Sequence, residues 1–268
     1  MTNYRSHLSV TIRIVLASLT LGGFITIPER TFSVTVFNSP IAFHFSASFL
    51  AGMIALAATW AGLEAALRTH PQKALLHHTF RFWGLPTTIV LTGAVLLPGI
   101  RANGVWLLVL GAMGIMLAIS MAGEYHTINP AAPTYARARL LLNGLDYIVA
   151  AVAFILLYLS NSRSLISASL IGLVAGLLSL DLLRGSQVRW RLIFLYSVVI
   201  ALMLAQLTAV LNYWPFASVR VALVLLVGFY LLIGLSQQSL RDELTQRRFL
   251  EYLAVTGVTV VVIFLFPG

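Results

Sequence analysis

The residues with the clearest chemical potential are ionisable side chains inside apolar stretches. Asp146 lies within the apolar run 138–160, and Arg139 and Asn143 precede it at helical spacing. Residues spaced i, i+4 and i+7 share one face of a helix. An acid is costly inside a bilayer, so Asp146 is a candidate for binding a proton, a cation or a lipid headgroup.

A second polar group, Glu124 to His126, ends the preceding apolar run 104–123. A short loop joins the two runs, which must therefore be antiparallel neighbours. We expect one polar cluster on the cytoplasmic side, made of Asp146, Asn143, Arg139, Glu124 and His126. Two interpretations stay open. The cluster is either an ion-pair network that fixes helix register, since Arg139 offers Asp146 a partner, or a site for an ion or solute.

The other embedded acids have partners one helical turn away. Glu64 precedes Arg68 by four residues, and Asp181 precedes Arg184 by three. This spacing allows ion pairing along one helix face. We expect both pairs to be structural.

His44 lies inside the predicted span 41–66. An imidazole in an apolar helix can bind haem iron or chlorophyll magnesium, or it can hydrogen-bond a nearby carbonyl. A pigment- or haem-associated subunit therefore stays an alternative. The sequence requires no cofactor, and we expect no metal site.

Familiar catalytic motifs are missing from the sequence. It has no cysteine, no His-Glu-x-x-His, no Gly-x-Ser-x-Gly and no phosphate-binding loop. These absences disfavour an enzyme, although an enzyme acting on lipid headgroups stays an alternative.

The composition defines the environment of these side chains. Of 268 residues, 59% are hydrophobic and only 9% are charged, against about 25% charged in a soluble domain. Most of the surface must therefore face lipid, which excludes a soluble enzyme. The net charge of +9 then indicates membrane topology and anionic headgroups, and no nucleic acid.

A helix needs about 20 apolar residues to cross a bilayer. The sequence predicts an all-α polytopic bundle with about nine spans, forming a single domain over 1–268, because no loop has room for another domain. The predicted spans are 8–27, 41–66, 83–100, 104–123, 138–160, 164–183, 190–211, 216–236 and 250–267.

Lysine and arginine predict the orientation of these spans. Thirteen of the 17 basic residues lie in the N-terminus and in every second loop. Cytoplasmic loops carry such an excess. We therefore expect a cytoplasmic N-terminus and an outside C-terminus.

Three further segments have a distinct pattern. Residues 31–37 alternate with period two and predict a short extended segment on the outer surface. Residues 237–251 carry a charged stripe and predict an interfacial helix on the cytoplasmic side. Gly172 and Gly176 form a G-x-x-x-G, which predicts close helix packing, either internal or between subunits.

The C-terminal third resembles a known family. The segments Asp181-Leu-Leu-Arg-Gly185, Leu211-Asn-Tyr-Trp-Pro215, Phe229-Tyr-Leu-Leu and Leu244-Thr-Gln-Arg-Arg-Phe-Leu-Glu-Tyr252 are similar to an uncharacterised multi-pass membrane family of Chloroflexota-type bacteria. The resemblance covers roughly residues 180–255. It implies a bacterial cytoplasmic membrane and no particular activity.

These observations favour a non-catalytic interaction or scaffold subunit of a membrane assembly. The expected partners are the bilayer, anionic headgroups and other membrane subunits. A small-solute or ion transporter using Asp146 is the main alternative.

Overall fold

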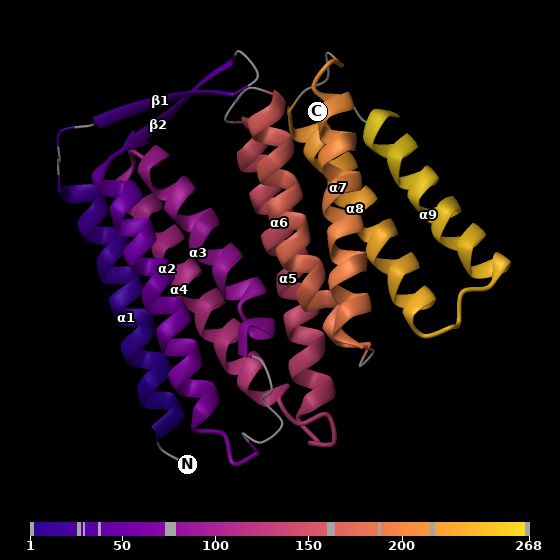
Figure 1. Ribbon diagram of the computed structural model, residues 1–268, viewed down its shortest axis with the longest axis horizontal. Helices are drawn as coiled ribbons and strands as arrows, with labels where there is room; N and C mark the ends of the chain where they lie inside the picture. Colours follow the sequence, from indigo (N-terminus) through magenta and orange to yellow (C-terminus); the bar gives the residue numbers. More distant parts are fainter. Residues whose placement is uncertain are drawn as a thin grey trace. The chain divides into compact units, whose positions relative to one another are not determined.

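The computed structural model describes residues 3–25, 28, 30–36, 39–72, 79–159, 164–186, 189–214 and 218–265. Within these residues the chain forms nine α-helices and one β-hairpin (Figure 1). Eight of these helices are long and apolar enough to cross a membrane. The all-α membrane bundle predicted from the sequence is therefore confirmed.

Contacts divide the chain into two compact units, Met1–Leu142 and Asn143–Gly268. The boundary falls inside helix α5 (Tyr135–Leu159). Whether the two units form the expected single domain over 1–268 stays a prediction.

The first unit is built on antiparallel helices whose ends are joined by aromatic contacts. The rings of Phe24 and Trp106 meet edge-to-face with centroids 6.2 Å apart, and Tyr4 stacks on Tyr125 at the opposite end. The start of the first helix therefore lies beside the end of the fourth. The elements of this unit before α5 are α1 (Asn3–Phe24), β1 (Arg30–Val36), β2 (Ser39–Phe45), α2 (Ala47–Arg68), η2 (Thr79–Phe82), α3 (Gly84–Leu96), η3 (Leu97–Gly99) and α4 (Asn103–His126).

A β-hairpin connects α1 to α2. Strands β1 and β2 pair antiparallel, with Val36 opposite Ser39 and Arg30 opposite Phe45. Strand β1 coincides with the extended segment predicted at 31–37, up to residue 36. Strand β2 was not expected, because its residues from 41 on were assigned to the start of the second span.

The second span begins later than predicted. The helix α2 starts at Ala47, so the expected start at residue 41 is wrong. Ser46 accounts for this start, because its hydroxyl accepts a hydrogen bond from the amide of Phe49 (3.2 Å) and caps the helix. His44 consequently lies on β2 and not inside a membrane-spanning helix, which corrects its predicted position.

The third predicted span, 83–100, is a short helix. With 13 residues, α3 is only about 20 Å long, against a hydrocarbon core of about 30 Å. It tightens into the 3₁₀ turn η3 at Pro98, which cannot donate the hydrogen bond that a longer helix requires. Its residues 84–90 are all buried, so neighbouring helices surround it.

The second unit contains the rest of α5 and four further helices. These are α6 (Ser164–Arg184), α7 (Trp190–Leu211), α8 (Ser218–Leu240) and α9 (Gln246–Leu265). Gln237 donates a hydrogen bond to the carbonyl of Leu182 (3.3 Å), and the hydroxyls of Tyr196 and Ser239 are 2.8 Å apart. These contacts bring the end of α6, the start of α7 and the end of α8 together. The basic residues Arg184, Arg189 and Arg191 and the basic segment 241–248 thus lie at one end of this unit, as the predicted topology requires.

The charged segment 237–251 is not one helix. Its first residues complete α8, residues 241–245 form a turn, and Gln246 begins α9. The predicted interfacial helix is therefore corrected to the turn between two spanning helices. Asp242 in this turn has a φ of 54°, a left-handed conformation that continued helix does not allow.

Candidate functional site

The predicted polar cluster is distributed over both compact units. Glu124, His126 and Arg139 belong to the first unit, and Asn143 and Asp146 belong to the second. Arg139, Asn143 and Asp146 share one face of α5, as predicted. The side chains of Asp146, Glu124 and Arg139 are buried, with 0%, 0% and 8% of each residue exposed. Whether all five form one site stays a prediction.

Glu124 is held at the end of α4 by the residue that terminates the helix. The hydroxyl of Thr127 donates to the carbonyl of Glu124 at 3.0 Å and lies 3.4 Å from its Oε2. Both residues are buried. The carboxylate is therefore positioned by local structure at the end of α4.

His126 takes part in an aromatic cluster that the sequence did not reveal. Tyr4 stacks on Tyr125 with centroids 4.3 Å apart, and the ring of His70 meets Tyr125 edge-on at 4.8 Å. His126 meets both tyrosines edge-on, at 6.3 Å and 5.7 Å. We call Tyr4, His70, Tyr125 and His126 the aromatic–histidine cluster. It joins the start of α1, the end of α2 and the end of α4.

The imidazole of His70 is tuned by this cluster. Partial burial, and secondarily the nearby imidazole of His126, hold the pKa of His70 below its ordinary value. Its Nδ1 accepts a hydrogen bond from the amide of Gln72 (3.1 Å), which favours the neutral ring. The His70 ring is therefore neutral near pH 7 and takes up a proton on acidification.

The two acid–arginine pairs predicted within helices are confirmed. Arg68 Nε lies 2.7 Å from a carboxylate oxygen of Glu64, and Arg184 lies 3.1 Å from one of Asp181. The first pair is partly open to solvent, whereas Asp181 is almost fully buried. Both pairs lie near the ends of their helices, on the predicted cytoplasmic side.

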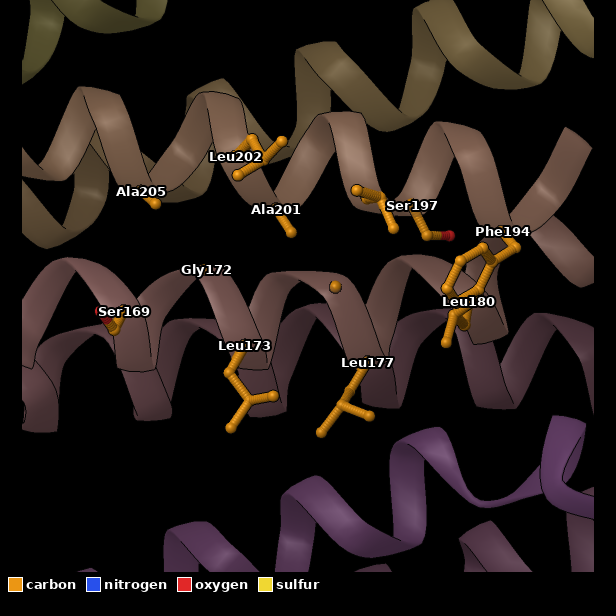
Figure 2. A pocket seen from close by; sticks show the side chains of 12 residues that line it. Ser169, Gly172, Leu173, Leu177, Leu180, Phe194, Ser197, Ala201, Leu202 and Ala205 are labelled. Atoms are coloured by element: carbon orange, nitrogen blue, oxygen red, sulfur yellow. The ribbon is translucent and has the colours of Figure 1, made fainter.

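The G-x-x-x-G segment packs inside the second unit. A Cβ added at Gly172 would lie 3.0 Å from the carbonyl oxygen of Ala201, and one added at Gly176 would lie 3.2 Å from the Cβ of Ala201. These glycines therefore let α6 and α7 approach closely. The pair of helices leaves an open apolar groove of about 470 Å³ along its seam (Figure 2).

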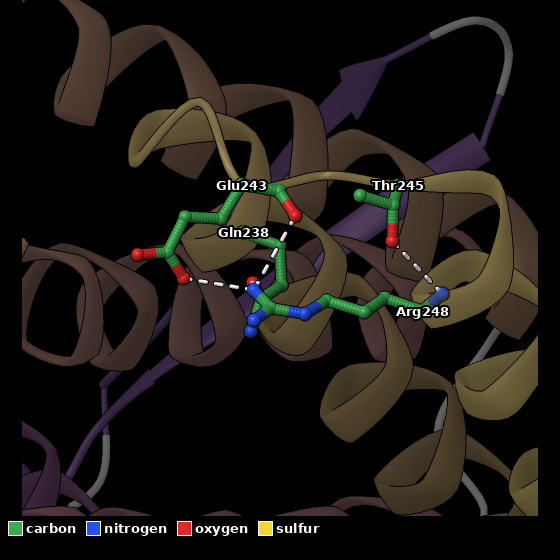
Figure 3. A network of polar contacts seen from close by, with 4 residues as sticks. All are labelled: Gln238, Glu243, Thr245 and Arg248. Atoms are coloured by element: carbon green, nitrogen blue, oxygen red, sulfur yellow. Dashed lines mark hydrogen bonds and ion pairs between the residues drawn. The ribbon is translucent and has the colours of Figure 1, made fainter.

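The turn between α8 and α9 is closed by a single arginine. Figure 3 shows the guanidinium of Arg248 reaching the side chain of Gln238 and both the carbonyl and the carboxylate of Glu243. The hydrogen bond from Arg248 lowers the pKa of Glu243. The predicted stripe Glu243, Arg247, Glu251 is thus divided, since Arg247 pairs with Glu251 at 3.1 Å within α9.

Tyrosine and phenylalanine rings connect α5, α8 and α9. Phe229 meets Tyr147 and Phe154 edge-on at 5.9 Å and 6.0 Å, and Tyr230 lies 6.0 Å from Tyr252. The Tyr252 ring also covers Gly234. In the sequence, only Gly234 indicates a close contact at this point, because a glycine leaves room for a neighbouring ring.

The described residues contain no group of three or more His, Asp or Glu side chains that could hold a metal ion. With His44 on β2, the haem or pigment interpretation loses the position inside a spanning helix on which it was based.

Residues 27–266 match the family described as Protein of unknown function (DUF5656), so the chain belongs to this family. An uncharacterised family is compatible with the resemblance seen in residues 180–255, whereas the bacterial group stays a prediction. No curated protein matches the chain. No solved structure matches it. The chain is an integral membrane protein by its eight long apolar helices.

Proposed function

We propose that this protein is a non-catalytic subunit of a membrane assembly and that α9 binds a transmembrane helix of another polypeptide. The observation that supports this role is the burial of the spanning helices. Seven of the eight bury 28–56% of their most apolar window, whereas α9 buries none of it. Most spanning helices are held by packing against several neighbours. One side of α9 contacts α8 through Tyr252 and Arg248, and the remaining exposed surface, which includes Val258, is available to another helix.

The absence of cysteine allows a direct test. Val258 on α9 is 65% exposed, and Leu108 on α4, a spanning helix that is more apolar than α9, is 74% exposed. The variants Val258→Cys and Leu108→Cys would carry a photoreactive maleimide in native membranes. We expect Val258→Cys to give a product containing a second, different polypeptide, and Leu108→Cys to give none. A protein that stays monomeric at both positions, or that links only to its own copies, contradicts the proposal.

Transport is the second candidate, and the burial of Asp146 favours it. This carboxylate is 0% exposed within a spanning helix, where ionisable residues usually serve a solute or proton. Asp146→Asn should then abolish proton-coupled uptake into vesicles while insertion is unchanged. Asp181→Asn is the matched control, since Asp181 is buried to nearly the same extent on another spanning helix. Normal uptake by Asp146→Asn eliminates this candidate.

We further propose a bacterial cytoplasmic membrane, with the N-terminus inside and the C-terminus outside. In this arrangement the short apolar segment of α3 and η3 crosses the membrane in addition to the eight long helices. The basic segments gathered at one end of the second unit support this orientation. An alkaline phosphatase fused after Gly268 should be active, because this enzyme folds only outside the cytoplasm. Inactivity there, with activity for a fusion after Leu240, would reverse the proposed orientation of the second unit.

A further inference from the structure

The groove along α6 and α7 has the shape and the charge pattern of a lipid site. It is open, apolar and about 470 Å³ in volume. Its lining includes the small residues Gly172 and Ala201 and the larger exposed side chains of Leu173 and Phe194 (Figure 2). All these residues belong to the second unit.

The length of the groove distinguishes between its possible occupants. Along α7 its lining extends from Phe194 to Ala205, which corresponds to roughly 16 Å of helix. That is about half of the ~30 Å hydrocarbon core. A partner helix would need a seam across the whole core, whereas one acyl chain occupies a single leaflet.

Charge is present at one end of the groove. Phe194 and Leu180 mark this end, and Ser169 and Ala205 mark the other (Figure 2). Arg191 precedes Phe194 by one helical turn and so continues the same face of α7. Arg191 and the neighbouring Arg189 are exposed. On α6 the corresponding continuation is Arg184, which Asp181 neutralises.

We propose that the α6–α7 groove binds one anionic phospholipid of the cytoplasmic leaflet. One acyl chain lies between Leu173 and Phe194, and the phosphate of the headgroup contacts Arg191. Trp190 stands at the same level of α7, where indole rings favour the membrane interface. The groove residues are on α6 and α7 and not on α9. Lipid binding in the groove and helix binding by α9 can therefore be tested independently.

Native mass spectrometry of the detergent-solubilised protein tests this site. The probes are dioleoylphosphatidylglycerol and dioleoylphosphatidylcholine, which have the same acyl chains and differ in charge. We expect the wild type to bind the first lipid about fivefold more tightly, as one arginine near a membrane surface provides. Arg191→Gln should remove this preference, and Arg137→Gln, at an exposed arginine of α5, should retain it.

Filling the groove tests the acyl chain separately. Ser169→Phe places a ring at one end of the groove and should weaken binding of both lipids. Ser18→Phe on α1 is the matched control, because both hydroxyls donate to the carbonyl four residues earlier at 2.8 Å. Equal binding of the two lipids by the wild type, or unchanged binding by Ser169→Phe, overturns the proposal.

A third variant, Leu173→Cys, detects a protein occupant. Reaction of this thiol with a bifunctional maleimide should leave the chain monomeric. A cross-link to a second polypeptide would show that a helix fills the groove, and would also overturn the proposal.

Discussion

The ring of Tyr4 lies parallel to the ring of Tyr125, with an interplanar angle of 8° and centroids 4.3 Å apart. These residues are far apart in the sequence, and their contact fastens the first turn of α1 to the last turn of α4. The ring of His70, just after the end of α2, meets the same tyrosine edge-to-face at 4.8 Å. Tyr125 is therefore the centre of the aromatic–histidine cluster.

Replacing Tyr125 should weaken the first unit at this end. Aromatic pairs are worth about 0.5–1.5 kcal/mol each beyond the burial of their area. Tyr125→Ala loses the contacts to Tyr4 and His70, so we expect a loss of about 1–3 kcal/mol and a lower melting temperature in detergent. Tyr125→Phe keeps the rings and should stay close to wild type. Tyr213→Ala, at a residue 85% exposed, serves as the surface control.

The cluster should also make stability depend on pH. The pKa of His70 in the folded protein lies below its ordinary value of 6.5. The unfolded state therefore takes up the proton first as the pH falls. Stability is full above about pH 6.5 and decreases below it, until the lower pKa of the folded state is reached.

Melting curves at pH 7.5 and pH 5.5 test this dependence. His70→Asn keeps an acceptor for the amide of Gln72 but cannot titrate, so its melting temperature should change less between the two pH values. His7→Asn, at an exposed histidine of α1, should behave as wild type. An unchanged pH dependence in His70→Asn would assign it to another group.

Short-range patterns explain which features were predictable. Eight spans follow from apolar length, and the pairs Glu64–Arg68 and Asp181–Arg184 follow from spacing within one helix. Strand β2 was missed because its apolar residues suit a membrane helix equally well. Its identity depends on pairing with β1 and on the cap at Ser46.

Long-range contacts explain what the sequence could not show. Nothing near Tyr4 in the chain indicates that it stacks on Tyr125, because the contact depends on how α1 and α4 pack. Similarly, the charged stripe of Glu243, Arg247 and Glu251 fits a helix by spacing alone. The turn between α8 and α9 depends instead on the contact of Arg248 with Gln238 on α8, which spacing within one helix does not predict.

Close packing of α6 on α7 predicts intolerance of added atoms. A Cβ at Gly172 would lie 3.0 Å from a backbone oxygen and 3.1 Å from the Cβ of Ala205. Such overpacking costs about 1–3 kcal/mol, so Gly172→Ala should lower the melting temperature. Gly111→Ala on α4 meets no atom within 4 Å and should be neutral or stabilising. If Gly172→Ala and the wild type melt at the same temperature, α6 and α7 can move apart to accept the methyl group without loss of stability.

At Asp242, the left-handed residue of the α8–α9 turn, a glycine variant should be more stable than an alanine variant, which is the reverse of the usual order. Asp242 has a φ of 54°, which costs an ordinary residue about 1–2 kcal/mol and glycine almost nothing. Asp242→Gly should therefore be more stable than Asp242→Ala. At the neighbouring Arg241 the order should be the opposite, because φ is not positive there and glycine increases the freedom of the unfolded chain.

Arg248 and Arg247 are adjacent arginines with different expected roles. Arg248 joins Gln238 at the end of α8 to Glu243 in the turn, whereas Arg247 pairs only within α9, where its side chain is 89% exposed. Arg248→Ala should accelerate hydrogen exchange of the amides between residues 241 and 250, while Arg247→Ala leaves it near wild type.

Acidification should reproduce the effect of removing Arg248. The hydrogen bond from Arg248 lowers the pKa of Glu243, so the contact is present above the ordinary carboxyl pKa and is lost as the pH falls through the lowered value. Intrinsic exchange rates also change with pH, and protection factors correct for this. In the wild type, protection of the turn should decrease on acidification below about pH 4.5. In Arg248→Ala it should already be low and change little, and an equal decrease in both proteins would show that Glu243 does not hold the turn.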